Sequence, residues 1–155
     1  MEDPAVAAFW QTFAEATSTN APHTAWAFGL ESDPEMATEL GLLVRDGPKR
    51  ATAGVLAEYE EAGEPLPAVG DYSVILDGRG RPLCIICTTS VEIKPMGAVD
   101  EGFAWDEGEG DRSLTFWRRV HVEAFGLAGY PIDDESPLVL ERFDLVWPEK
   151  PADST

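Results

Sequence analysis

The chain has 155 residues, of which 44% are hydrophobic, and its 29 acidic and 11 basic residues give a formal charge of −18. This length suits one domain with a sizeable core, and no apolar run approaches the roughly 20 residues of a membrane helix. The charge argues against broad binding to duplex DNA, which depends on many Lys and Arg contacts to phosphate, but it is compatible with a small nucleotide or a short single strand in a local basic pocket.

The first part of the chain is predicted to contain an N-terminal helix followed by an aromatic stretch. Apolar residues recur at helical spacing from Pro4 to Ala16, which indicates an amphipathic helix packed on the body. Met1 to Pro4 lack the basic region of a signal peptide, so we expect a cytoplasmic protein without a membrane partner. Trp26 to Leu30 suits either a strand or a packed loop.

Two more helices are expected in the next part of the chain. Asp33 and Pro34 are typical of an N-cap and a first-turn proline, so a helix should begin there and end near Gly47. Its predicted buried residues are Met36, Leu40 and Leu43. A further helix is predicted to start at or soon after Thr52 and to run to Gly63.

A hairpin is predicted in the middle of the chain. Asp77 to Gly80 is a strong turn signal between a strand at Tyr72 to Leu76 and a return strand at about Pro82 to Ile93. Cys84 and Cys87 both lie in the return strand. Because residues three apart on a strand point to opposite faces, we predict free thiols rather than a disulfide or a joint metal site.

The last third combines helices with one strand. Gly97 to Trp105 is predicted to contain a short helix, and Ser113 is a good N-cap for a helix from Leu114 to about Phe125. Pro137 to Trp147 alternates as a strand, in which Arg142 suggests a bulge. Helices do not alternate regularly with strands, so we predict an α+β fold whose strands form a small β-barrel with flanking helices.

Three of the eleven basic residues lie within positions 45–50, whereas the first 44 residues hold none. A Gly-Pro turn at positions 47–48 can aim the side chains of Lys49 and Thr52. A lysine can bind an anion, or act as a base where burial lowers its pKa, and a threonine hydroxyl is a nucleophile when a base lies nearby. The P-loop pattern is absent, and the alternative is a helix end with cations placed favourably against the dipole.

Acidic residues alternate with glycines from Glu107 to Asp111, and Arg112 and Ser113 follow. Glycines allow sharp turns and the close approach of a ligand, and a carboxylate such as that of Glu107 can act as a general base or orient a lysine. The spacing does not match a calcium loop, so we predict neither a metal site nor a cofactor. The alternative is an acidic loop in which Asp111 or Ser113 caps the next helix.

Aromatic residues offer further candidates for a ligand site. Trp117, His121 and Phe125 share a helical stripe, which suits either the core or an acid-base group at His121. Trp26 and Trp105 are candidate stacking surfaces for a nucleobase, with ordinary packing as the alternative.

Three segments together resemble the ASCH domain family: Gly47 to Thr52, the turn at Gly70 and Asp71 with its hairpin, and Phe103 to Leu114 leading to Trp117 and His121. The resemblance implies a PUA-like β-barrel with a cleft that binds RNA or a nucleoside. Residues 26–147 would form the ASCH domain, residues 1–25 a helix and loop packed on it, and residues 148–155 a polar tail.

The family resemblance also implies candidate chemistry. Some members look like ribonucleases acting on single-stranded RNA, and smaller members resemble acetylcytidine amidohydrolases that use a Lys, a Thr three residues later and a Glu. Those positions fall on Lys49, Thr52 and Glu107. The family pattern has an Arg five residues after the lysine, where this chain has Gly54, a departure that it shares with a longer, bacterial-type subgroup.

Three hypotheses follow for the function. In the first, the protein binds RNA or a nucleotide. If it is also catalytic, it is a ribonuclease in which Lys49 neutralises phosphate and Glu107 is the base for the 2′-hydroxyl. In the second, Thr52 attacks the acyl group of an N-acylated cytidine-type nucleoside. In the third, the protein is a non-catalytic binding or regulatory module. The predicted ligand-binding residues are Trp26, Arg50, Trp105, Ser113 and His121.

Overall fold

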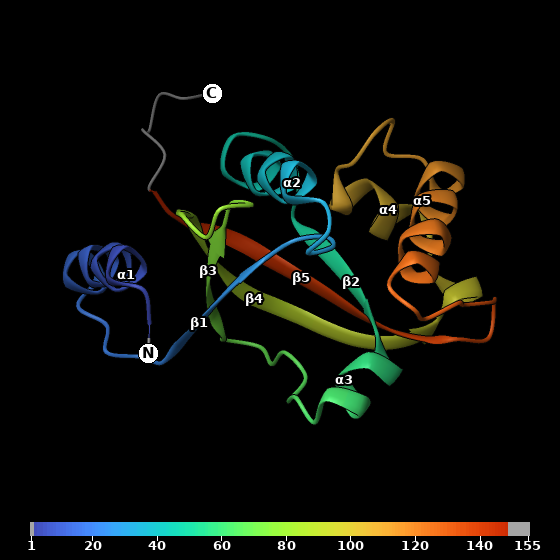
Figure 1. Ribbon diagram of the computed structural model, residues 1–155, viewed down its shortest axis with the longest axis horizontal. Helices are drawn as coiled ribbons and strands as arrows, with labels where there is room; N and C mark the ends of the chain where they lie inside the picture. Colours follow the sequence, from blue (N-terminus) through green and yellow to red (C-terminus); the bar gives the residue numbers. More distant parts are fainter. Residues whose placement is uncertain (1, 149–155) are drawn as a thin grey trace. The chain divides into compact units, whose positions relative to one another are not determined.

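The computed structural model describes residues 2–148, which form two compact units. Within these residues, the first unit comprises 2–46, 70–87 and 144–148, and the second comprises 47–69 and 88–143. Apart from Pro148, the predicted polar tail lies outside the described residues. β4 (Pro82–Pro95) and β5 (Pro137–Trp147) contribute to both units (Figure 1).

The elements alternate irregularly along the chain. The first unit contains α1 (Pro4–Thr17), β1 (His23–Ala27), α2 (Pro34–Asp46) and β3 (Tyr72–Leu76). The second contains β2 (Ala51–Val55), α3 (Leu56–Ala62), a 3-10 turn (Met96–Ala98), α4 (Glu101–Glu107) and α5 (Leu114–Leu127). The strands follow the order β1-β3-β4-β5-β2. β1 pairs with β3 in parallel, whereas the β3–β4 and β2–β5 pairs are antiparallel. The predicted α+β class is confirmed.

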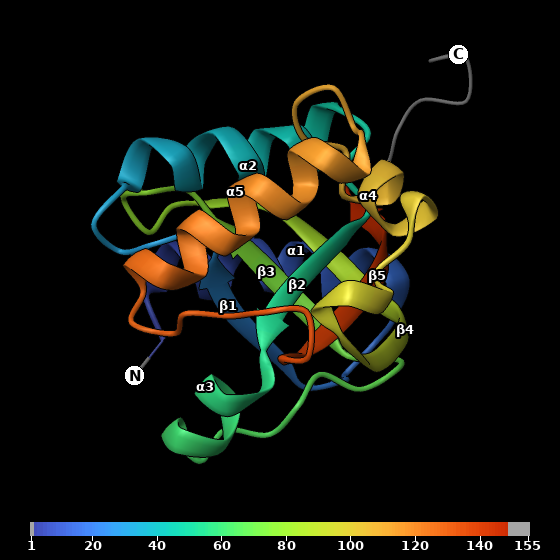
Figure 2. The ribbon, with the colours of Figure 1, turned by 90° about the vertical axis from the view of Figure 1, so that its right-hand side faces the viewer.

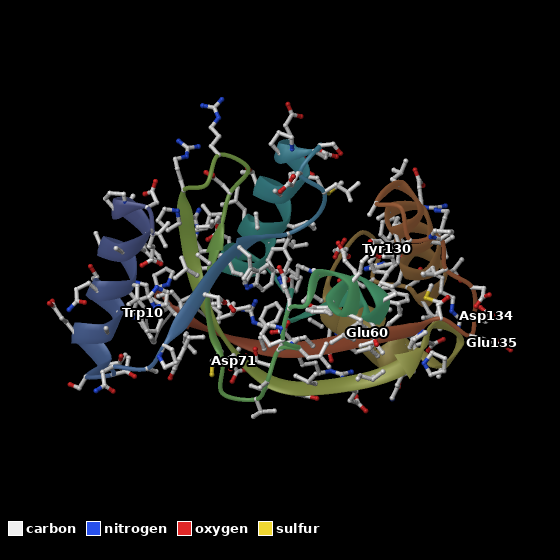
Figure 3. All side chains as sticks on the ribbon, turned by 60° about the horizontal axis from the view of Figure 1, so that its bottom comes forward. Trp10, Glu60, Asp71, Tyr130, Asp134 and Glu135 are labelled. Carbon is white, nitrogen blue, oxygen red and sulfur yellow. The ribbon has the colours of Figure 1, made fainter. Side chains whose placement is uncertain are left out.

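In the first unit, α1 covers the strands with an aromatic face. Asp3 caps the helix by accepting a hydrogen bond from the backbone N of Ala5 at 2.8 Å. Trp10 projects from α1 (Figure 3) and stacks on His23 of β1, with ring centroids 4.2 Å apart. The buried residues of this cluster are Val6, Trp10, Phe13, Ala14, Val74 and Ile85. Each large apolar side chain buried in this way stabilises the fold by about 1.5–3 kcal/mol.

α2 begins as predicted, but it buries a different face. Its predicted inward residues, Met36, Leu40 and Leu43, are exposed or half-buried, and the buried ones are Ala37, Gly41 and Val44. The buried stripe is therefore shifted by one residue in every turn. A Cβ at Gly41 would lie 2.5 Å from Cδ1 of Leu83, so the helix approaches the strands through its small residues.

In the second unit, the helix predicted to end at Gly63 is present, but the residues expected at its start form a strand. Residues 51–55 form β2 rather than the start of a helix, because they pair with residues 138–142 of β5, and α3 begins only at Leu56. This pairing runs through Arg142 without a register shift, so Arg142 causes no bulge in it. Leu138 and Leu140 share a face with Arg142, while Val139 and Phe143 are buried on the other face beside Glu141, so β5 buries apolar side chains on both faces.

The second unit has its own core, in which α4, α5 and β2 lie together (Figure 2). Its buried residues are Ala51, Val55, Met96, Val99, Phe103, Ala104, Trp117, Leu138 and Leu140. The short helix predicted within Gly97 to Trp105 forms later, as α4, with Asp100 as its N-cap. Ser113 caps α5 as predicted.

The cysteines and the helices agree with two further expectations. Cys84 and Cys87 are free thiols on β4, the first buried and the second half-buried. Among the described residues, each helix is too short or too polar to cross a bilayer.

Candidate functional site

The turn before β2 places Lys49. Its neighbour Arg50 donates its backbone N–H to the carbonyl of Asp106 at 2.7 Å and accepts from the N–H of Phe143 at 3.0 Å. The guanidinium of Arg50 donates to the carbonyls of Gly47 and Lys49, at 3.3 and 2.6 Å. The turn is thus tied to the end of α4 on one side and to β5 on the other, which fixes the direction of the Lys49 side chain.

Lys49 is a buried cation. Its side chain is only 1% exposed, and Nζ donates to Oε1 of Glu107 at 2.9 Å, to Oε2 of Glu109 at 2.8 Å and to the carbonyl of Ala51 at 2.8 Å. Burial alone would lower the pKa of Lys49, but the charges of Glu107 and Glu109 outweigh it and raise the pKa above its ordinary value. Lys49 is therefore an ammonium group and not a base.

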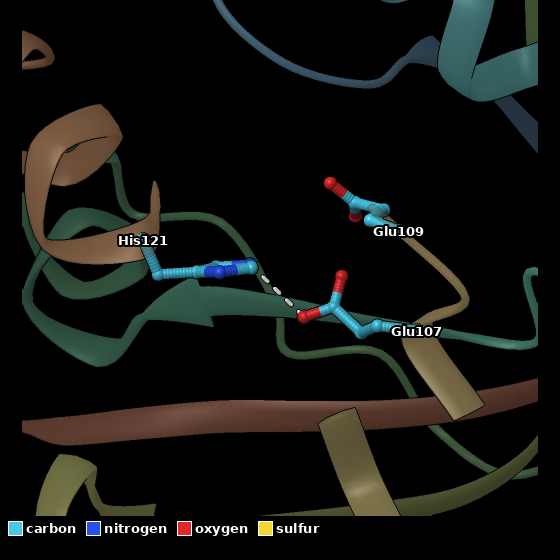
Figure 4. A group of neighbouring side chains, drawn as sticks. All are labelled: Glu107, Glu109 and His121. Carbon is cyan, nitrogen blue, oxygen red and sulfur yellow. Dashed lines mark ion pairs between the residues drawn. The ribbon is translucent and has the colours of Figure 1, made fainter. Parts of the chain in front are cut away.

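Glu107, the last residue of α4, is also 1% exposed. One carboxylate oxygen accepts from Lys49, and the other accepts from Nε1 of Trp117 and from Nε2 of His121 at 2.9 Å (Figure 4). Burial would raise the pKa of this carboxyl, but the charges of Lys49 and His121 hold the pKa well below its usual range. Glu107 is thus a firmly ionised carboxylate and a weak base.

His121 lies between two acceptors. Nδ1 is 2.8 Å from the carbonyl of Trp117, and Nε2 is 2.9 Å from the Glu107 carboxylate. Because both partners accept, the geometry favours a proton on each ring nitrogen, which is the imidazolium form. Burial would lower the pKa of His121, but the charge of Glu107 outweighs burial and raises the pKa above its ordinary value. The ring also stacks on the Trp117 indole at 4.2 Å.

Glu109 is the accessible carboxylate of the group, with its side chain 20% exposed on the loop after α4 (Figure 4). Burial raises the pKa of Glu109, and the neighbouring charge of Glu107 adds to this increase, against the opposing effect of Lys49. Gly108 (φ +69°) turns the chain between the two glutamates. A Cβ there would lie 2.9 Å from both N and Cα of Lys49, so the close approach requires glycine.

The Lys49 cluster, by which we mean Lys49, Glu107, Glu109 and His121, has the ligand types of a metal site. Donor atoms of Glu107, Glu109 and His121 all lie within 4.8 Å of one another. The Lys49 ammonium, however, already lies within hydrogen-bond distance of both carboxylates. A divalent cation would have to displace it, so we assign no metal to these residues.

Comparison with known proteins places this chain in a family. The ASCH domain model matches residues 24–147. The chain belongs to the ASCH domain family. The solved ASCH domain of Lactobacillus crispatus JV V101 is similar to this chain, with a TM-score of 0.80 and 30% identity over 92% of this chain and 94% of that one.

A protein from Enterococcus faecalis V583, described as a member of the DUF984 family, is also similar, with a TM-score of 0.80 and 36% identity over 92% of this chain and 88% of that one. No curated protein matches the chain. Membership of the ASCH family confirms the resemblance seen in the sequence and the predicted PUA-like fold.

Thr52 does not share the face of β2 that packs near the Lys49 cluster. Ala51 and Val55 belong to the core that contains Trp117, and alternate residues of a strand point to opposite faces. Thr52 therefore lies on the other face, directly across from Glu141 in β5. Glu141 accepts a hydrogen bond from Thr88 at 2.6 Å.

The other predicted ligand-binding residues of the ASCH domain have different surroundings. Trp105 is 56% exposed, and the Arg112 guanidinium lies 3.6 Å from the centroid of its ring. Ser113 uses its hydroxyl to accept from the backbone N of Phe116 at 3.1 Å, as a helix cap. Trp26 belongs to the first unit, where it packs edge-on against Phe28.

Two members of the site were missed as such in the sequence. In the sequence Glu109 is one residue of the acidic segment, although the glycines on both sides of it signal a close approach. The sequence pattern places Trp117 on the helical stripe, and in the structure its indole N–H is a donor to Glu107. The structure thus brings together Lys49, Glu107 and His121 from the predicted set and adds these two.

Proposed function

We propose that this ASCH domain binds an anionic nucleotide or the end of a short single-stranded RNA at the Lys49 cluster. The observation that carries this proposal is the convergence of two cations, Lys49 and His121, on the single buried carboxylate of Glu107. Glu107 balances only one of these two cations and Glu109 balances the other, so a ligand phosphate can serve as a partner for Lys49 in the way that Glu109 does. The charge of −18 on the whole chain disfavours a long polyanion, so the ligand should be small or bound at one end.

Cleavage of the bound RNA is the second candidate function, and Glu109 favours it. A general base needs a pKa closer to neutrality than that of an ordinary carboxylate. The pKa of Glu109 is raised and its side chain is partly exposed, whereas the pKa of Glu107 is depressed. In this mechanism Glu109 takes the proton of a ribose 2′-hydroxyl, and the 2′-oxygen bonds to the adjacent phosphorus as the P–O5′ bond breaks. The leaving 5′-oxygen takes a proton from solvent, and Lys49 and His121 stabilise the charge that develops on phosphate.

The amidohydrolase alternative receives less support from the geometry. It requires the hydroxyl of Thr52 close to Lys49, but strand alternation directs Thr52 to the other face of β2. The third hypothesis, a non-catalytic binding module, differs from the ribonuclease only in predicting ligand affinity without turnover.

Binding of labelled single-stranded RNA and of 5′-nucleotides, followed by fluorescence anisotropy and calorimetry, tests the proposal. His121→Gln removes one cation and keeps a hydrogen-bonding side chain, so it should weaken binding by at least about tenfold, the order expected for one charged hydrogen bond. Lys94→Met, at a partly exposed lysine of the same unit, is the matched control and should leave affinity nearly unchanged. Absence of binding by the wild type, or equal affinities of all three proteins, would overturn the proposal.

A further inference from the structure

The Lys49 cluster needs two carboxylates to be neutral. Lys49 and His121 each carry one positive charge, and Glu107 supplies one negative charge. An uncompensated charge in a buried group is strongly unfavourable. The fourth member, Glu109, restores neutrality through its contact with Lys49 at 2.8 Å.

The two carboxylates are held very differently. Glu107 is almost fully buried and bonded to Lys49, Trp117 and His121. Glu109 is partly exposed and contacts Lys49 at 2.8 Å, and burial together with the nearby charge of Glu107 raises the pKa of its carboxyl. Glu109 is therefore the anion of the cluster that can leave most easily.

We propose that Glu109 masks an anion-binding site, and that a phosphate or carboxylate group of the ligand takes its place on Nζ of Lys49. This inference rests on the proposed function in that the arriving anion belongs to the nucleotide or RNA. The exchange conserves charge when a monoanion replaces the Glu109 carboxylate. Glu107 and His121 stay in place throughout and keep Lys49 oriented.

The exchange requires rotation of one side chain rather than movement of the loop. The loop itself is closely packed at two glycines. A Cβ added at Gly108 would lie 2.9 Å from the Lys49 backbone, and one added at Gly110 would meet the Phe116 ring. Arg112 also ties the loop to α4 through a 2.9 Å hydrogen bond to the carbonyl of Trp105. A glutamate side chain has three rotatable torsions, which let the carboxylate turn into solvent from a fixed backbone.

Inorganic phosphate and adenosine 5′-monophosphate are suitable probes, titrated calorimetrically into the full chain. Glu109→Gln keeps the shape of the side chain but removes the competing charge, so both anions should bind at least about tenfold more tightly than to the wild type. Glu109→Ala should do the same. Glu101→Gln, at an exposed glutamate of α4, makes the same change in net charge and should alter affinity less than about twofold.

The outcomes separate this inference from the proposed function. Tighter phosphate binding by both Glu109 variants, with no binding of nucleotide or RNA by any protein, would support the masked site and refute the proposed function. Nucleotide binding by the wild type that is unchanged or weakened in both Glu109 variants would refute the masked site and leave the proposed function standing. An equal gain in Glu101→Gln would reduce the effect to net charge and also refute the masked site.

Discussion

Replacing Lys49 by methionine should lower the free energy of unfolding by about 3 kcal/mol. Removal of one partner of a buried ion pair costs about 3–5 kcal/mol, because the other charge stays buried without compensation. Here Glu107 keeps its bonds to Trp117 and His121, and Glu109 can turn to solvent, so the lower end of the range applies. The loss corresponds to about 6–12 °C in Tm for a domain of this size.

Urea unfolding followed by tryptophan fluorescence measures this loss, with circular dichroism as a check that the variant folds. Lys94→Met is the control, since Lys94 is partly exposed and its ion pair with Glu92 spans 3.5 Å, and it should cost less than about 1 kcal/mol. In the double variant Lys49→Met with Glu107→Gln, the two changes should cost less than their sum. A single Lys49→Met variant as stable as Lys94→Met would show that the buried network does not stabilise the fold as described.

Three further predictions concern backbone geometry and titration. Gly108→Ala should lower the free energy of unfolding by about 1–3 kcal/mol, because Gly108 has a positive φ and contacts the Lys49 backbone. At Gly126 an added Cβ meets no atom within 4 Å, so Gly126→Ala should stabilise α5 by about 0.5–1 kcal/mol in thermal melts. Burial would lower the pKa of His121, but the charge of Glu107 outweighs burial and raises it. The stabilisation from His121 is therefore full below its unfolded pKa and is lost as the pH rises through its folded pKa. The difference in the free energy of unfolding between the wild type and His121→Gln should fall over that pH range. Burial raises the pKa of Tyr59 to about 12, so an ultraviolet titration should lose a step near pH 12 in Tyr59→Phe.

Local signals account for the elements that the sequence predicts well. The apolar residues of α1 recur at helical spacing within 14 residues, and its cap, Asp3, directly precedes them. The β3–β4 hairpin has its turn signal between two strands that contain β-branched residues. β2 could not be predicted in this way, because residues 51–55 become a strand only through pairing with β5, more than 80 residues later. The buried face of α2 could not be predicted from its large apolar residues, because the helix approaches the strands at Gly41, which has no side chain.

The candidate site shows the same division between local and distant information. Lys49 and Glu107 were selected by residue type and by the family resemblance, and their 2.9 Å ion pair is observed, while their roles toward a ligand stay predictions. The face of β2 on which Thr52 lies follows from the alternation of side chains along a strand. Because a helix is predicted near Thr52, the sequence gives no such alternation there. The raised pKa of Glu109 depends on burial and on the charge of Glu107, which only the folded chain supplies.

The most direct test of the central claim follows the two histidines of the chain by NMR during titration with a 5′-nucleotide. His121 belongs to the Lys49 cluster, whereas His23 lies in the first unit, beside Glu2. We expect the ring signals of His121 to shift in a saturable manner while those of His23 stay in place. Saturable binding of the nucleotide that shifts only His23, or neither histidine, would contradict the placement of the ligand site at Lys49 and His121.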